Sequence, residues 1–254
     1  MTPTLKIPQH LLKTTPKYYI QSSSVDRRLV KGNLKGKKIL NIGCGKTMVS
    51  DVFFTLRGAK VISLDLDMDQ LKQARLKLNQ CVQEKSLKKS QLPHLVLGNG
   101  ESLNYKDSTF DYIVTYSAIE HTYDKSSIPK AIAEAIRVLK PGGKFIITGP
   151  NLLNLPVTIL SWLFHKRRNV PEHRFTPRSL RRLLTSQGLI IEEQDAESVY
   201  IIDKDLIETR FPWLWWLPKV IFRTTSKILE IMNLSKAYNK TFGMRIGFRA
   251  RKTK

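Results

Sequence analysis

The segment ILNIGCGKT, residues 39–47, constrains the fold more than any other stretch of the chain. Its apolar start predicts a short buried strand, and Gly43 and Gly45 predict an abrupt turn after that strand. The residues from Thr47 to Phe54 then have helical length, with a glycine stop at Gly58. A strand, a glycine turn and a helix point free backbone N–H groups at a ligand. The segment therefore predicts a ligand-binding edge in an α/β fold.

Two phosphate-binding interpretations of this turn fit poorly. A P-loop requires G-x-x-x-x-G-K-[ST], and Gly45-Lys46-Thr47 match its tail, but its first glycine would fall at Leu40, inside the predicted strand. A dinucleotide fingerprint requires G-x-G-x-x-G, and Met48 occupies the place of the third glycine. The turn by itself is compatible with ligand binding or with a plain tight turn.

A carboxylate follows at the expected distance from the turn. Residues 60–65, KVISLD, predict a second strand that ends at Asp65. An acid at a strand tip about twenty residues beyond a glycine turn can accept hydrogen bonds from both ribose hydroxyls of a nucleoside. Asp67 or Asp69 is then predicted to cap the next helix. These residues predict a nucleoside-containing ligand.

The most specific segment is GNGESLNYKDSTFDYIVTYSAIEHTYD, residues 98–124. Together with ILNIGCG and Asp65 it resembles the class I S-adenosylmethionine (SAM)-dependent methyltransferases, in particular the methyltransferase type 11 or ubiquinone/menaquinone methyltransferase-like family. The strings AIAEAIRVLKPGGKFIITGPN and EHRFTPRSLRRLLTSQGLIIEEQD are also similar to that family. In the second string Thr176 is expected to cap a helix that begins at Pro177. The resemblance covers residues 37–195.

The resemblance implies an α/β, Rossmann-like, doubly wound sheet of seven strands. The sheet is mostly parallel, and its last strand, expected over residues 242–251, runs antiparallel between the fifth and sixth strands. We expect residues 1–36 to form an N-terminal basic arm or helix. Residues 37–254 would form the methyltransferase domain, with helical lid insertions at about 150–172 and 200–238.

The resemblance also implies the cofactor, SAM, and its contacts. The expected cofactor-binding residues are Asn41, Gly43, Cys44, Gly45, Asp65, Leu66, Asn99, Gly100, Glu101 and Ser117. His121, at the end of the fourth strand, is the first candidate for a base or acceptor contact, because histidine can take a proton near neutral pH. An equally open interpretation is that Glu120-His121 only orders the loop or lines the cofactor. His173 is a second candidate, and no metal site is expected.

Three positions depart from the family pattern. Asn41 stands where an acid is usual, Thr47 where a third glycine is common, and Asn99 where an aspartate is usual. Each substitution weakens polar contact to SAM. A SAM-binding protein without catalytic activity therefore remains an alternative.

Composition narrows the acceptor without naming it. The net charge of +22 indicates an anionic partner such as a nucleic acid, a membrane surface or an acidic substrate. Two cysteines give neither a disulfide framework nor zinc-ligand spacing, which favours a cytoplasmic protein. Residues 211–217, from Phe211 to Leu217, hold three tryptophans between Arg210 and Lys219, which suits a peripheral position at an anionic membrane.

We therefore expect a small-molecule acceptor: a lipid, a quinone or a lipid-linked sugar. An RNA methyltransferase is the alternative favoured by charge. It is less favoured because the sequence shows no RNA-binding module, and no Asn-Pro-Pro-Tyr motif follows the fourth strand, where Ser-Ala-Ile-Glu stands at residues 117–120. The sequence does not predict the oligomeric state.

Overall fold

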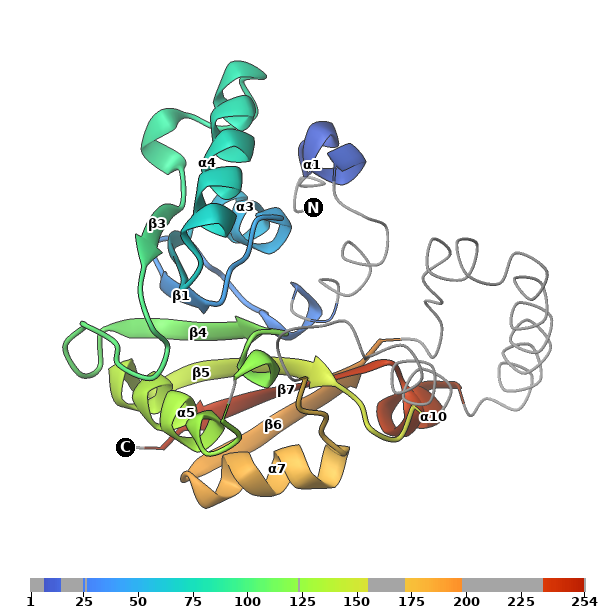
Figure 1. Ribbon diagram of the computed structural model, residues 1–254. Coiled ribbons are helices and arrows are strands. Elements are labelled where there is room, and N and C mark those ends of the chain that lie inside the picture. Colours follow the sequence, from blue (N-terminus) through green and yellow to red (C-terminus); the bar gives the residue numbers. More distant parts are fainter. Residues whose placement is uncertain are drawn as a thin grey trace, which may run out of the picture.

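The computed structural model describes residues 7–14, 25, 27–122, 124–154, 172–197 and 235–253. These residues form a seven-stranded sheet in the order β3-β2-β1-β4-β5-β7-β6, with helices on both faces (Figure 1). Strand β7 is antiparallel to β5 and to β6, whereas the other neighbouring pairs are parallel. The doubly wound, mostly parallel sheet and the place of its antiparallel last strand are confirmed.

The elements follow one another as alternating strands and helices. In chain order they are α1 (Gln9–Thr14), β1 (Lys38–Ile42), α3 (Val49–Leu56), β2 (Lys60–Asp65), α4 (Met68–Gln83), η1 (Lys89–Gln91), β3 (His94–Leu97), β4 (Phe110–Tyr116), η2 (Ile119–His121), α5 (Ser127–Val138), β5 (Leu139–Pro150), α7 (Pro177–Ser186), β6 (Leu189–Ala196), α10 (Ser235–Phe242) and β7 (Arg245–Lys252).

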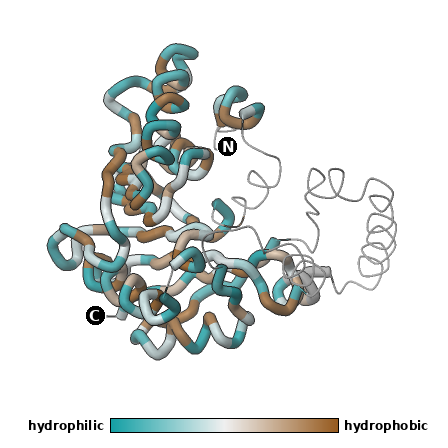
Figure 2. Tube along the Cα trace, in the orientation of Figure 1, coloured by the Kyte–Doolittle hydropathy of each residue, from teal (hydrophilic) through white to brown (hydrophobic). Residues whose placement is uncertain are grey.

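The sheet is buried on both faces, which explains why its strands read as nearly continuous apolar runs. One face packs α5 and α7 against buried residues of the strands, including Phe110, Phe145 and Phe248. The opposite face packs α3 and the segment around Leu29 against Ile39 and neighbouring residues. Figure 2 shows the hydrophobic stretches, in brown, along the sheet and its covering helices. The carboxyl ends of the parallel strands are thereby left as one edge for a site.

Local capping follows the sequence. The side chain of Asp67 accepts hydrogen bonds from the backbone N–H groups of Asp69 and Gln70, which caps α4. Thr176 accepts from the N–H of Ser179, and Pro177 occupies the first turn of α7. Of the two predicted caps of α4, Asp67 and Asp69, the structure shows Asp67, and the predicted cap at Thr176 is confirmed.

Two strand boundaries differ from the sequence-based expectation. Strand β5 begins at Leu139, which pairs with Phe110, and the next pairs join Lys144 to Tyr112, so residues 140–143 bulge out of the ladder. Their proline and glycines indicate a break, but pairing continues on both sides of it. The last strand begins at Arg245, and Phe242 instead ends α10.

Most of both predicted insertions, including all of residues 211–217, lies outside the described residues. Within the described ranges no helix is long and apolar enough to cross a membrane.

Candidate active site

The glycine turn after β1 is tied to the end of β2 by backbone hydrogen bonds. The N–H groups of Gly43 and Cys44 donate to the carbonyl oxygen of Leu64 over 2.8 and 3.0 Å. The N–H of Gly45 donates to Oδ2 of Asp65 over 2.7 Å. Both glycines have positive φ, 71° and 58°, a conformation that disfavours other residues. The turn and the β2 carboxylate are therefore held as one unit.

Asp65 retains capacity for a ligand. Its Oδ1 accepts from the N–H of Asp67 over 3.0 Å, and its side chain is only partly buried. Each carboxylate oxygen can accept more than one hydrogen bond. The neighbouring Leu66 is 72% exposed, an unusual state for a leucine at a strand end. A carboxylate with spare lone pairs beside an open apolar side chain suits a ribose with an attached base.

The turn after β3 lies against the same edge. Oδ1 of Asn99 accepts from the N–H of Glu101 over 2.9 Å, which closes the turn locally. A side chain at Gly100 would come within 2.9 Å of Ile42, so the turn packs directly on the end of β1. The three sequence segments expected to bind the cofactor thus meet at the carboxyl ends of β1, β2 and β3.

The loop after β4 crosses over the glycine turn. Ser117 has a positive φ of 46°, rare for a residue with a side chain, and its N–H donates to the carbonyl oxygen of Thr148 over 3.2 Å. A Cβ placed on Gly43 would lie only 2.1 Å from Cβ of Ala118. Glycine at position 43 is therefore required by this crossing as well as by its φ.

The fold brings His121 and His173 into one region. His121 ends η2 with an exposed side chain. The N–H of His173 donates to the carbonyl oxygen of Glu120 over 2.8 Å, and Nε2 of His173 lies 3.0 Å from the carbonyl oxygen of Thr122. Because a carbonyl only accepts, Nε2 of His173 carries the proton, and the lone pair of the neutral ring lies on Nδ1.

Two buried carboxyl groups that both interact with the charge of Arg245 are not among the site residues predicted from the sequence. Glu120 is 1% exposed and Glu197 is 4% exposed. Burial raises the pKa of Glu120 to about 7 against the opposing charge of Arg245. Burial likewise raises the pKa of Glu197 to about 7. The string Glu120-His121 marks the first position, but no motif marks Glu197, because its surroundings depend on the pairing of β6 with β7.

Two of the residues predicted to bind the cofactor are buried within the protein. Burial raises the pKa of the Cys44 thiol far above its usual range, which agrees with Cys44 serving as a small residue rather than a nucleophile. Asn41 is 3% exposed, and its amide donates to Asp51. Among the described residues, no three His, Cys, Asp or Glu side chains are grouped to hold a metal ion.

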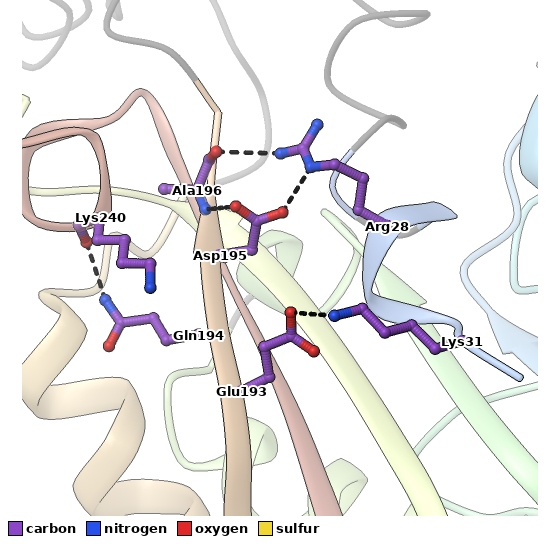
Figure 3. A pocket seen from close by; sticks show the side chains of 7 residues that line it. All are labelled: Arg28, Lys31, Glu193, Gln194, Asp195, Ala196 and Lys240. Carbon is purple, nitrogen blue, oxygen red and sulfur yellow. Dashed lines mark hydrogen bonds and ion pairs between the residues drawn. The ribbon is translucent and has the colours of Figure 1, made fainter. Parts of the chain in front are cut away.

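A polar pocket of about 450 Å³ lies at the other end of the sheet, beside its edge strand β6 (Figure 3). Two ion pairs span it: Arg28 Nε to Asp195 Oδ2 at 2.6 Å, and Lys31 Nζ to Glu193 Oε1 at 2.5 Å. These pairs join the segment before β1 to β6. They fix the N-terminal segment on the sheet edge and stand apart from the glycine turn.

Comparison with known proteins agrees with this geometry. Residues 40–147 match the methyltransferase domain family. A ubiquinone biosynthesis O-methyltransferase from Idiomarina loihiensis is 32% identical over 130 residues, which are 51% of this chain and 47% of that protein. A phthiotriol/phenolphthiotriol dimycocerosates methyltransferase from Mycobacterium leprae is 36% identical over 114 residues, 44% of this chain and 37% of that protein. The chain thus spans less than half the length of either relative.

The fold also matches solved structures. Magnesium protoporphyrin IX methyltransferase from Synechocystis, with bound S-adenosylhomocysteine (SAH), superposes with a TM-score of 0.60 at 16% identity, covering 93% of this chain and 84% of that one. That likeness shows the fold, and the domain match covers the glycine turn, Asp65, the turn after β3 and β4. Residues 40–147 are thus similar to methyltransferase domains, and the described residues have a fold like that of a solved methyltransferase.

Proposed function

We propose that the protein transfers a methyl group from SAM to a small-molecule acceptor of the quinone or lipid type. The proposal that SAM is the methyl donor is based on one observation. The hydrogen bond from the N–H of Gly45 to Asp65 joins the glycine turn to the β2 carboxylate, and the Asn99 turn lies on the same edge of the sheet. The acceptor class is supported by relatives named for ubiquinone biosynthesis and for phthiotriol dimycocerosates.

The proposed cofactor contacts follow from the chemistry of each group. Asp65 would accept the ribose hydroxyls with its remaining lone pairs. The turn of Asn99, Gly100 and Glu101 would hold the adenine beside Leu66, since it offers backbone N–H groups and the exposed leucine offers an apolar wall. The other expected contacts (Asn41, Gly43, Cys44, Gly45 and Ser117) would surround the methionine end.

Methyl transfer from a sulfonium is an in-line displacement with a neutral leaving group. The protein therefore has mainly to hold the acceptor atom opposite the methyl group and to exclude water. For a hydroxyl acceptor a base also helps. We assign this role to His173 ahead of His121, because two hydrogen bonds fix His173 against the loop after β4 and leave its Nδ1 with the lone pair.

The decisive experiment incubates the protein with methyl-labelled SAM and separated lipid, glycan and RNA fractions. Label in the lipid fraction supports the proposal, and label in RNA would replace it with the RNA methyltransferase alternative. SAM binding in calorimetry without transfer to any fraction would identify the protein as a non-catalytic binder.

The roles of the histidines are separated by three alanine variants. H173A should lower kcat about 100-fold if His173 is the base, while the dissociation constant of SAM stays unchanged. H121A should have a smaller effect. H94A is the matched control, because His94 is exposed at the opposite, amino end of a strand. A kcat loss in H121A larger than that in H173A would reverse the assignment.

Membrane attachment is a separate part of the proposal and is based on sequence alone. Trp213, Trp215 and Trp216 lie outside the described residues. Flotation with anionic vesicles, compared between the wild type and a variant with all three tryptophans replaced by alanine, tests it. Equal flotation of the two proteins would remove the tryptophans from the proposal.

A further inference from the structure

A buried carboxylate lies beneath the glycine turn, in the first turn of α3. Asp51 is 2% exposed, and the Nδ2 group of Asn41 donates to both of its oxygens over 3.0 Å each. The hydroxyl of Ser63 donates to Oδ1 of Asp51 over 2.5 Å. Two side-chain donors, the amide of Asn41 and the hydroxyl of Ser63, converge on one carboxyl group, an arrangement that stabilises an ionised carboxylate.

This carboxylate has no cationic partner in the part of the chain that the structure describes. No lysine, arginine or histidine forms an ion pair with Asp51 there. Burial raises its pKa, and the hydrogen bonds from Ser63 and Asn41 oppose that rise. A buried charge without a counter-charge is costly, so a positively charged ligand nearby would be favoured. The charge of Asp51 already acts on Cys44, within the glycine turn.

The same contacts fix the orientation of Asn41. The Nδ2 atom of Asn41 lies 3.0 Å from both oxygens of Asp51, so the amide nitrogen of Asn41, and not its carbonyl oxygen, faces that carboxylate. This oxygen is buried and accepts no hydrogen bond within the described ranges. An oriented and unused acceptor beside the glycine turn is what a cationic N–H group of a ligand would need.

We propose that Asp51 is a positioning residue for the cofactor: it supplies the negative charge that related methyltransferases carry at position 41, and it holds Asn41 with its oxygen presented to the ammonium group of SAM. The acid has moved from the end of β1 to the first turn of α3, and the amide at position 41 transmits its effect. The departure at Asn41 is thereby compensated within the chain. This inference rests on the proposed cofactor site.

The test compares three ligands by titration calorimetry. SAM carries a sulfonium and an ammonium group, SAH carries only the ammonium, and 5′-methylthioadenosine carries neither. We expect D51N to weaken SAM binding by about 10- to 100-fold and SAH binding by somewhat less. The affinity for 5′-methylthioadenosine should stay within about two-fold of the wild type, because that ligand has no cationic group that could interact with Asp51.

The exchange variant N41D/D51N gives the sharper result. It keeps one carboxylate and one amide in the same pair and places the acid where the family has it, so SAM binding should return to within a few-fold of the wild type. N41D alone opposes two carboxylates and should bind SAM poorly. S63A is the matched control: it removes one donor to Asp51 and should lower the unfolding temperature without changing the ratio of SAM to methylthioadenosine affinity.

Equal weakening of all three ligands by D51N would show a purely structural role and overturn the inference. A folded N41D/D51N variant that fails to recover SAM binding would also overturn the inference. If D51N does not fold, the N41D/D51N variant is used for the test instead. A wild type that binds 5′-methylthioadenosine and SAM equally tightly would also overturn the inference while leaving the cofactor site intact. Failure of the wild type to bind any of the three would overturn the cofactor site itself and the inference with it.

Discussion

The two halves of the sheet edge are built in different ways. On the β3-β2-β1 side the contacts of the proposed cofactor site join residues of short motifs, such as Gly45 with Asp65 and Asn99 with Glu101. On the β4-β5 side Glu120 and His173 are brought together from two segments that lie far apart in the sequence. A cofactor of constant shape can be recognised by local turns, whereas the acceptor side depends on long-range pairing. The proposed cofactor side can therefore be predicted from short sequence motifs, and the proposed acceptor side cannot.

The largest effect is expected where the two halves touch, at Gly43. G43A places a Cβ at 2.1 Å from Cβ of Ala118 and at a φ of 71°. Overpacking and left-handed strain together should lower the free energy of unfolding by roughly 4 kcal/mol. Chemical denaturation measures this change, and SAM binding should fall with it because the glycine turn must shift.

G142A is the matched control for G43A. Its φ is 73°, but nothing lies within 4 Å of an added Cβ, so only the backbone strain remains, about 1 to 2 kcal/mol. The double variant G43A/A118G should recover part of the loss. Equal destabilisation by G43A and G142A would mean that the crossing of the β4 loop over the turn contributes nothing.

The second prediction tests the proposed cofactor side alone. D65A removes the acceptor of the Gly45 N–H and the proposed ribose contacts, so SAM should bind about 100-fold more weakly in titration calorimetry. D69A is the control, because Asp69 is an exposed acid in the first turn of α4, and its side chain pairs only with Lys72 among the described residues. A D65A variant with unchanged SAM affinity would remove Asp65 from the site.

The third prediction concerns the proposed acceptor side and the pH dependence of the free energy of unfolding. Because burial raises the pKa of Glu120 to about 7, the folded state favours its neutral form. Its favourable contribution to stability is complete below the unfolded pKa, near 4.5, and is lost as the pH rises through 7. E120Q should therefore gain stability relative to the wild type between pH 5 and pH 8, by about 2 to 3 kcal/mol in denaturation.

Two features isolate that effect. Glu197 titrates over the same range but is present in both proteins, so it cancels in the difference. E134Q is the control of opposite sign: the hydrogen bond from Arg137 holds the pKa of Glu134 at about 2. Its contribution is present above its unfolded pKa and is lost only as the pH falls towards 2, so the E134Q difference should be flat from pH 5 to pH 8. A flat E120Q difference would contradict the prediction.

The contrast between the two sides also shows which features of the structure can be predicted from the sequence. The caps at Asp67 and Thr176 follow from local patterns, whereas the sheet, its antiparallel last strand and the meeting of the cofactor segments follow from the family resemblance that the motifs carry. The start of β5 does not, because pairing with Phe110 continues across a proline-glycine segment. The contact of His173 with Glu120 does not either, because it depends on Phe175 joining the end of β5, a long-range pairing without a motif.

The smallest expected effect is a loss of stability at Thr176, and it tests whether the two sides are independent of each other. Thr176 accepts a hydrogen bond from the N–H of Ser179 and begins α7 just after the segment that holds His173. T176A should lower the free energy of unfolding by about 1 kcal/mol, while SAM affinity stays unchanged because α7 packs on β6 and β7. T185A is the control, since Thr185 is exposed and its hydroxyl, within the described ranges, donates only to the carbonyl oxygen of Arg182 in α7. If T176A weakened SAM binding in calorimetry, the proposed cofactor and acceptor sides would be coupled. The sequence motifs of the cofactor side would then not be enough to describe that side.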